Sequence, residues 1–349
     1  MSDRRIDPSG YFLKFYQWLV QKKHFLASVG VLLPIFAIFQ NCAMQVTGSR
    51  PTPTSAAPSV DGCPTSSFIF SSATSGTTLL VPNGCVGVVA KVWGAGGGSS
   101  GSNHGGGGAF TQSTLSVTAG QSLFIQVGGA GISGTITPGT SSAGGVNGGG
   151  QGGIGSSVSG SGGGGYSAIT IDGSLSLLSG GGGGAAYQND GGDAGGPDAS
   201  PGTSLTSGNE GAGATQIAGG LGGLVGVVGN PTGGTSGTQL LAGDGGSNVV
   251  AAWGGGGGGG GFYGGGGGST ASYMIPPHCA LCDPLPAVSS PDRIGSGGGG
   301  SSFNPIMPAV FAAGNSGAAG NAGDSEWISP HGNSGSDGLV VIKFLSTAP

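Results

Sequence analysis

Runs of consecutive glycine are the feature that most constrains the fold of this chain. The longest run is Gly254–Gly261, and Phe262, Tyr263 and five more glycines follow it. Ordering the backbone of one residue costs roughly 1–2 kcal/mol, and glycine loses more freedom than any other residue. A glycine run also has no side chains to bury in compensation. An isolated run therefore stays disordered, and order requires that several runs pack together.

Close packing of glycine runs is possible because no Cβ stands between neighbouring backbones. Extended left-handed helices with three residues per turn have no internal hydrogen bonds, so every N–H and C=O is free to pair with a neighbouring run. A net gain of ~0.5–1.5 kcal/mol per hydrogen bond roughly offsets the ordering entropy. We therefore expect a bundle of polyglycine II helices, with Phe262 and Tyr263 as an aromatic plug. The shorter runs are Gly105–Gly108, Gly162–Gly165, Gly180–Gly184, Gly264–Gly268 and Gly297–Gly300.

The composition favours a folded, mainly β protein over a disordered chain. Glycine provides 86 of 349 residues, but only 7% of residues are charged, whereas disordered chains usually carry a high net charge. Short β-branched runs separate the glycine blocks, which indicates strands. Alternating apolar residues predict a strand over 86–92, and Asn83-Gly84 before it predicts a hairpin turn. A second hairpin is predicted over 166–179 with Asp172-Gly173 at its turn, and the last strand over 337–345.

The N-terminus predicts export. Five of the nine basic residues lie in the first 24 positions, and the apolar run Phe25–Phe39 follows them. This order is typical of a secretory signal, and the run is short for a membrane span, which needs ~20 residues. Cys42 resembles the lipidated first residue of a bacterial lipoprotein, although Phe39, Gln40 and Asn41 depart from the usual residues before the cysteine. The alternative is an uncleaved N-terminal anchor helix.

Both interpretations place the rest of the chain outside the cytoplasm, tethered to a membrane. Ala43 in place of aspartate after the cysteine is similar to lipoproteins sorted to the outer membrane, so we expect a cell-envelope protein exposed at the surface. Three segments follow from this: a signal over 1–41, a tether rich in Pro, Thr and Ser over 42–65, and a glycine-rich β domain over 66–349.

Cysteine usage agrees with an oxidising compartment. Besides Cys42 the chain has Cys63, Cys85, Cys279 and Cys282, an even number. Cys63 and Cys85 flank one strand unit, and a disulfide between them contributes ~3 kcal/mol in the chain-entropy model. Cys279 and Cys282 form a CxxC pair beside one histidine, which is one ligand short of a structural zinc site. We expect a local disulfide there and no metal.

Strand and glycine blocks alternate in a fixed order along the chain. Four of them are VPNGCVGVVAKVWGAGGG (81–98), YSAITIDGSLSLLSGGGGGAA (166–186), GGGGGGGGFYGGGGGS (254–269) and GSDGLVVIKF (335–344). This ordered set resembles a known glycine-rich domain of tail-fibre-like adhesins from phages and bacteria. A relative of that domain forms the extracellular glycine-rich region of anaplastic lymphoma kinase and leukocyte tyrosine kinase. The resemblance covers roughly residues 66–347 and implies a β-sandwich framework that encloses packed polyglycine helices and serves binding.

Motifs for catalysis are weak. Lys91 lies in VVAKVW, which only superficially resembles the kinase strand with its catalytic lysine, and the H-R-D and D-F-G motifs are missing. Asp190, Asp193 and Asp198 share one glycine-rich loop, where calcium is conceivable, but a solvated acidic loop is favoured because the calcium-binding nonapeptide repeat is missing. We expect no enzyme, no cofactor and no bound metal.

The prediction is therefore a non-catalytic binding module, an adhesin or a receptor-recognition protein. Its ligand is expected to be a glycan or a protein on a surface. Nucleic acid is an unsuitable partner, because only four basic residues follow Cys42 against twelve acidic ones. The alternative is a structural component of the envelope or matrix. The candidate binding surface consists of the aromatic residues Trp253, Phe262, Tyr263 and Tyr273.

Overall fold

The computed structural model describes residues 62–224, 233–249, 252–270, 294–306 and 310–349. All of them belong to the unit Pro58–Pro349. Their regular structure is entirely β strand, which confirms the mainly β prediction. None of these residues belongs to a helix of the length and apolarity that a membrane crossing requires. The predicted signal or anchor segment, Cys42 and most of the tether lie outside the described residues.

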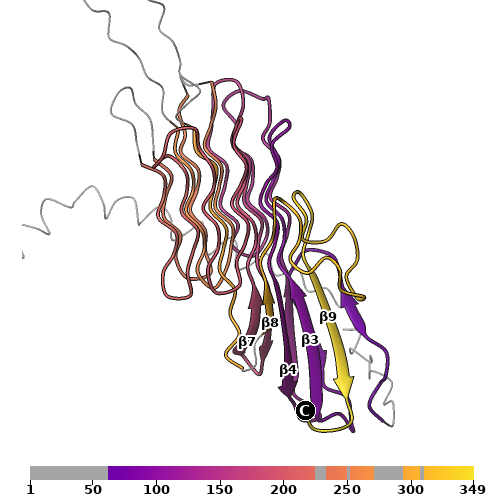
Figure 1. The fold of residues 1–349 in the computed structure, drawn as a ribbon. Coiled ribbons are helices and arrows are strands. Elements are labelled where there is room, and N and C mark those ends of the chain that lie inside the picture. The colour runs from indigo at the N-terminus through magenta and orange to yellow at the C-terminus, as the bar shows by residue number, and fades with distance from the viewer. Residues whose placement is uncertain (1–61, 225–232, 250–251, 271–293, 307–309) are drawn as a thin grey trace, which may run out of the picture. The chain divides into compact units, whose positions relative to one another are not determined.

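The strands form two antiparallel sheets (Figure 1). The first sheet has the order β1-β9-β3-β4-β8, with β1 over Phe68–Phe70, β9 over Leu339–Leu345, β3 over Gly87–Trp93, β4 over Phe110–Ser116 and β8 over Val310–Ala312. The second sheet has the order β2-β5-β6-β7, with β2 over Thr74–Leu80, β5 over Ser122–Val127, β6 over Ser167–Ile171 and β7 over Ser174–Ser179.

Both sheets contribute to one hydrophobic cluster. Alternation along β3 sends one set of side chains into this cluster, as the pattern over 86–92 predicts, although Val86 itself precedes the strand and is 40% exposed. The same period of two acts in β5 and β9. Burial of these faces is what holds the sheets against each other. Its buried members from strands of both sheets include Val88, Ala90, Val92, Leu123, Ile125, Ile169, Leu177, Val340 and Ile342.

The two predicted turns have different outcomes. The β6–β7 hairpin is confirmed, with Ile171 opposite Ser174. Asp172 and Gly173 have φ of 48° and 82°, as a tight hairpin turn requires. The hairpin at Asn83-Gly84 is wrong, because β2 and β3 belong to different sheets and this turn carries the chain between them. Burial decides this, since Val81 and Cys85 on either side of the turn both belong to the shared cluster.

The predicted disulfide between Cys63 and Cys85 is confirmed. It closes a sequence separation of 22, with the Cα atoms 4.9 Å apart. It attaches the start of the described chain to the beginning of β3. Cys279 and Cys282, the second predicted pair, lie outside the described residues.

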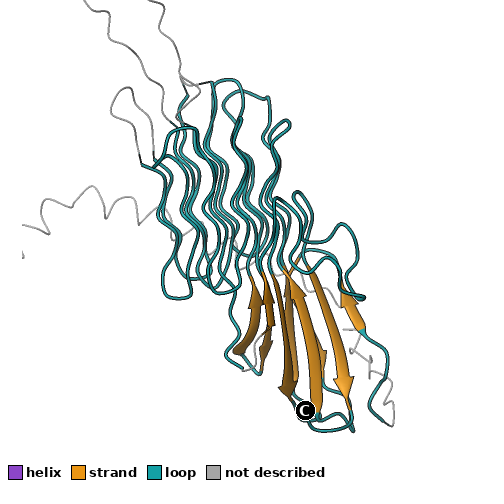
Figure 2. Cartoon of the chain, viewed as in Figure 1, coloured by secondary structure: helices purple, strands orange, loops and turns teal. Residues whose placement is uncertain are grey.

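The glycine-rich segments lie beyond one end of the strands rather than between the sheets (Figure 2). Strand β3 passes directly into residues 94–98, and β7 into residues 180–186. The resemblance implied a bundle enclosed by the framework, and the observed arrangement instead extends the strands lengthwise. We call these packed segments the glycine array. Strands at one end fix the positions of segments that could not order alone.

A glycine array with an outer end as candidate binding site

The central run, Gly254–Gly261, is surrounded by other segments of the array. Its backbone amide groups donate to carbonyls 2.8–3.0 Å away, and the acceptors repeat with a period of three. One neighbouring segment accepts from every third residue: Val158 from Gly254, Ser161 from Gly257 and Gly164 from Gly260. A second segment provides Gly246 for Gly255 and Gly243 for Gly258. A third provides Gly295 for Gly256 and Gly298 for Gly259. Each third residue therefore faces the same neighbouring segment.

The carbonyls of the central run follow the same period toward three other segments. They accept from Gly153 and Gly150, from Gly184 and Gly181, and from Gly268 and Gly265. Six segments thus surround the run, and the amides of Gly254–Gly260 and the carbonyls of Gly255–Gly260 are paired without any β ladder. Such pairing meets the requirement that buried N–H and C=O groups find partners.

No side chain fits on this run. A Cβ at any position of Gly254–Gly260 would stand less than 3.0 Å from a backbone atom of a neighbouring segment. At Gly257 the obstructing atoms include the carbonyl oxygens of Gly150 and Gln151. Backbone cannot move aside as the end of a flexible side chain can. The absence of Cβ is therefore a packing requirement here.

The predicted aromatic surface is divided between the two ends of this run. Trp253 precedes it and Phe262 follows it, and an extended run of this length spans about 25 Å at ~3.1 Å per residue. Phe262 stacks on Phe303 with ring centroids 4.4 Å apart and meets Tyr263 edge-on at 5.3 Å. Phe262 also packs against the buried cluster that contains Ala168 of β6 and Leu178 of β7, so it belongs to the end near the sheets. Tyr273 lies outside the described residues.

Trp253 marks the outer end of the array, away from the sheets. It stacks on Tyr187, with ring centroids 4.5 Å apart and ring planes inclined by 10°. The sequence analysis did not single out Tyr187. A signal was present, since Tyr187 lies three residues after the glycine run Gly180–Gly184, with only Ala185 and Ala186 between them.

Exposed apolar side chains accompany this pair on the outer loops. Ile136 is 83% exposed, Val249 71% and Leu205 59%. Backbone pairings place these loops at the outer end of the array. Thr135 accepts from Ser159, Thr203 accepts from Ser296, and Asn248 forms a bridge with Gly155. A group of exposed apolar residues on loops is typical of a contact surface.

In the acidic loop, the carboxylates of Asp190 and Asp193 accept backbone N–H groups, while Asp190 and Asp198 are exposed to solvent. The Asp193 carboxylate accepts the N–H groups of Gly107, Ser316 and Gly317 at 2.7–3.1 Å, and Asp190 accepts that of His104 at 2.8 Å. Among the described residues, no cluster of His, Cys, Asp and Glu is arranged to hold a metal ion. These carboxylates satisfy the ends of glycine segments.

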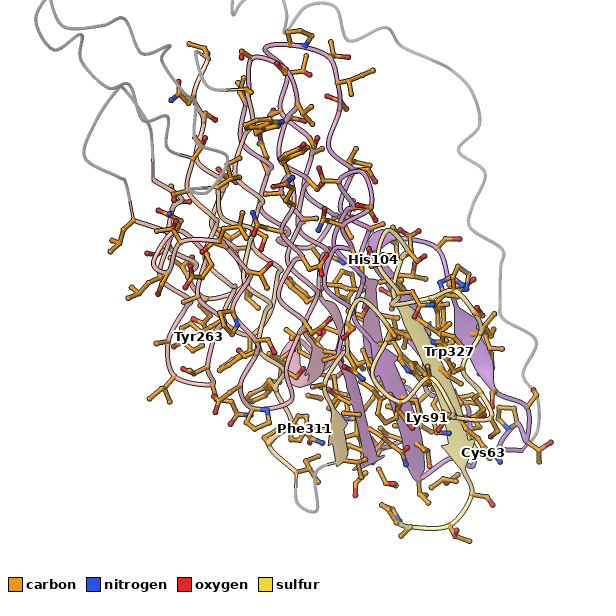
Figure 3. All side chains as sticks on the ribbon, turned by 45° about the horizontal axis from the view of Figure 1, so that its top comes forward. Cys63, Lys91, His104, Tyr263, Phe311 and Trp327 are labelled. Carbon is orange, nitrogen blue, oxygen red and sulfur yellow. A yellow bond between two sulfur atoms is a disulfide. The ribbon has the colours of Figure 1, made fainter. Side chains whose placement is uncertain are left out.

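Lys91 forms a partly buried ion-pair cluster on β3. Its Nζ lies 2.8 Å from Asp324 Oδ1 and 3.0 Å from Glu326 Oε2. Figure 3 shows Lys91 and Trp327 on the strand side of the molecule and Tyr263 on the array. The cluster fastens the segment that follows Asn321 to the first sheet, and Glu326 also accepts from Ser67 Oγ at 2.8 Å.

Folding changes the pKa of each group in this cluster. Burial disfavours the charge on Lys91, but hydrogen bonds and the charges of Asp324 and Glu326 outweigh burial and raise its pKa. Burial acts against the charge of Asp324 as well, and the hydrogen bond from Lys91 leads the contacts that lower its pKa. For Glu326 the hydrogen bond from Ser67 is the main cause of a lowered pKa. Each of the three groups therefore keeps its charge over a wider pH range in the folded protein than in the unfolded chain.

A hollow lies beside the exposed Leu221 and Leu224. It has a volume of about 250 Å³ and is lined mainly by Pro201, Ala212, Leu221 and Leu224, together with Glu210. The Glu210 carboxylate already accepts from Ser204 Oγ and the Gly208 N–H. The hollow is therefore an apolar depression of the surface.

No protein-family model matches this chain, and no curated protein matches it.

Proposed function

We propose that this protein is a membrane-tethered, surface-displayed binding module of the adhesin or receptor-recognition type, without catalytic activity. The observation that carries the proposal is the outer end of the glycine array, where loops with exposed apolar and aromatic residues are held by paired backbone. Binding residues commonly lie on loops that a rigid scaffold positions. The exposed residues Ile136, Val249 and Tyr187 meet this description.

The finer architecture belongs to the same proposal. We interpret the two sheets as a β-sandwich, on the support of their shared hydrophobic cluster. We interpret the glycine segments as polyglycine II helices, on the support of the hydrogen-bond period of three. A relationship to the glycine-rich domain of tail-fibre-like adhesins is part of this interpretation.

The alternative, a structural envelope or matrix component, requires arrays to join side by side. The sides of the array oppose this, because side chains stand there in place of glycine. Leu221 and Leu224 are 72% and 73% exposed at one edge, and a spacing of three residues places them on the same side of an extended helix. They would hold the backbone of another glycine segment away. The edge therefore favours a binding module over a self-assembling matrix.

The test is surface display together with adhesion. Cells that produce the full chain are treated with an external protease, and metabolic labelling with an alkyne fatty acid is compared between the wild type and Cys42→Ser. We expect lipid label on the wild type alone, cleavage on intact cells, and adhesion of these cells to at least one surface in a panel of cells and glycans. Protection from the protease on intact cells, or display without adhesion to any surface, would contradict the proposed function.

Equal fatty-acid labelling of the wild type and Cys42→Ser would contradict lipidation and leave the uncleaved anchor. That result would not affect the binding proposal, because either anchor tethers the domain to the membrane.

A further inference from the structure

We propose that the stacked pair Tyr187 and Trp253 is a binding site for a neutral glycan. This inference rests on the proposed function and names the ligand class at the outer end of the array. Its central observation is a parallel aromatic pair on a face where Tyr187 remains 37% exposed. A sugar ring has an apolar face of C–H groups and a rim of hydroxyls. An exposed aromatic ring with polar neighbours complements both features.

The backbone that carries Tyr187 is held in one conformation. Residues 186–189 form a tight turn closed by two backbone hydrogen bonds of 3.0 Å between Ala186 and Asn189. The side chain of Asn189 is 2% exposed, and its amide donates to the carbonyls of Tyr187 and Ile294, both at 2.9 Å. A buried amide that binds the carbonyl of the aromatic residue itself is a positioning contact. It lowers the entropy that a ligand must remove on binding.

The backbone of Trp253 is held in the same way. Its carbonyl accepts from Thr270 Oγ1 at 2.7 Å, and it forms a parallel bridge with Val158. The central glycine run begins at the next residue, and its amides from Gly254 to Gly260 donate to backbone carbonyls of neighbouring segments. The two rings therefore stand on neighbouring segments of the array, because Gly184 donates to Gly257 just below them. Rigid placement is what an aromatic platform needs to be selective.

The surroundings of the pair favour a neutral ligand. Two exposed neutral polar residues flank the pair. Gln188 lies in the same turn as Tyr187, and Ser157 precedes Val158, which forms the bridge with Trp253. The lysines of the described residues, Lys91 and Lys343, lie on strands β3 and β9, and those residues include no arginine. Asp190, next to the turn, is exposed. Among the described residues, a sulfated, phosphorylated or sialylated ligand would meet the Asp190 carboxylate and no lysine or arginine, so uncharged sugars fit best.

The experiment uses the full chain in detergent on an array of neutral and acidic glycans, followed by titration calorimetry with the strongest neutral glycan found. Tyr187→Ala and Trp253→Ala are compared with Ile217→Ala, a control that removes an 86% exposed apolar side chain near the opposite end. We expect each aromatic variant to weaken binding about tenfold or more, in the range of an interface hot spot. Ile217→Ala should change it less than about twofold, and Tyr187→Phe, which keeps the ring, should retain binding. Thermal unfolding of every variant checks that the fold is kept.

The failures of the two proposals are distinguishable. Adhesion of displayed cells that Tyr187→Ala and Trp253→Ala leave unchanged overturns the site and keeps the proposed function. Adhesion that both variants abolish, without binding to any neutral glycan, overturns the ligand class and points to a protein receptor or an acidic glycan. Display without adhesion to any surface overturns both.

Discussion

At the scale of single residues, the absence of Cβ decides which positions can lie at the centre of the array. Interior positions such as Gly257 face neighbouring carbonyl oxygens at distances that no Cβ tolerates. The large side chains of Leu221 and Leu224 are exposed at the edge, although small ones such as Ser161 and Ala194 are buried. Glycine in the interior is thus needed for hydrogen bonding between backbones.

The interior requirement predicts a large effect of one methyl group. Gly257→Ala should lower the free energy of unfolding of the full chain by about 1–3 kcal/mol or more, the usual cost of overpacking, because its Cβ would press against backbone. The matched control is Gly323→Ala, at an exposed position where a Cβ meets nothing within 4 Å. It should change stability by less than about 1 kcal/mol. Thermal unfolding measures both, and equal melting temperatures for the two variants would show that the run is a linker.

At the scale of elements, two long-range ties connect loops to the sheets. The Cys63–Cys85 disulfide secures the segment that precedes β1. The cluster of Lys91, Asp324 and Glu326 fastens a late loop to the centre of β3. The pKa values of Asp324 and Glu326 are lowered by folding, so their stabilisation is present above the unfolded values and lost as the pH falls through the folded ones. The raised pKa of Lys91 gives stabilisation that is lost only as the pH rises through its folded value.

The cluster therefore stabilises the fold fully between about pH 6 and pH 9. Lys91→Met keeps the apolar stem and leaves two carboxylates without their cation. We expect the free energy of unfolding at pH 7 to fall by roughly 3 kcal/mol. The difference from the wild type should shrink toward pH 3, where the carboxylates become neutral. Denaturant unfolding at both pH values checks this, with the exposed Lys343→Met of β9 as the control. A deficit that does not depend on pH would mean that Lys91 contributes by packing alone.

At the scale of the whole molecule, the sheets and the glycine array form one hydrogen-bonded body. Strand β3 continues into the segment 94–98, whose Ala95 donates to Gly165 and whose Gly98 donates to Gly162. The segment that contains these acceptors donates in turn to the array and leads into β6. Opening the array therefore requires loss of pairing on several segments at once. The tight turn of residues 186–189 is held to this body by the contacts of Asn189, and such anchoring is the basis of the proposed binding function.

Hydrogen exchange tests this cooperativity. In the full chain, amides of residues 254–261 should exchange about as slowly as those of β3, because both open only in a large unfolding event. Residues 137–140, an exposed turn, should exchange fast and serve as the internal reference. Mass spectrometry of peptic fragments measures the rates. Fast exchange of 254–261, comparable with the turn, would contradict a single cooperative body.

Local and periodic properties of the sequence were sufficient for part of this fold. Alternation predicted the buried face of β3, Asp172-Gly173 predicted the β6–β7 turn, and the cysteine spacing predicted the Cys63–Cys85 bridge. The large conformational entropy that glycine loses on ordering implied that the glycine runs become ordered only when several of them pack together. These inferences succeed because each depends on neighbouring residues or on one short closed loop.

Only the tertiary structure decided which segments meet. Asn83-Gly84 connects two sheets instead of forming a hairpin, since the shared core buries the residues around it. Trp253 and Phe262 lie at opposite ends of one run, and Trp253 meets Tyr187 from a distant segment. Glycine runs have no side chains to distinguish one partner from another, so their sequence does not encode their neighbours. The strands at their ends place them, and so determine which residues reach the outer surface.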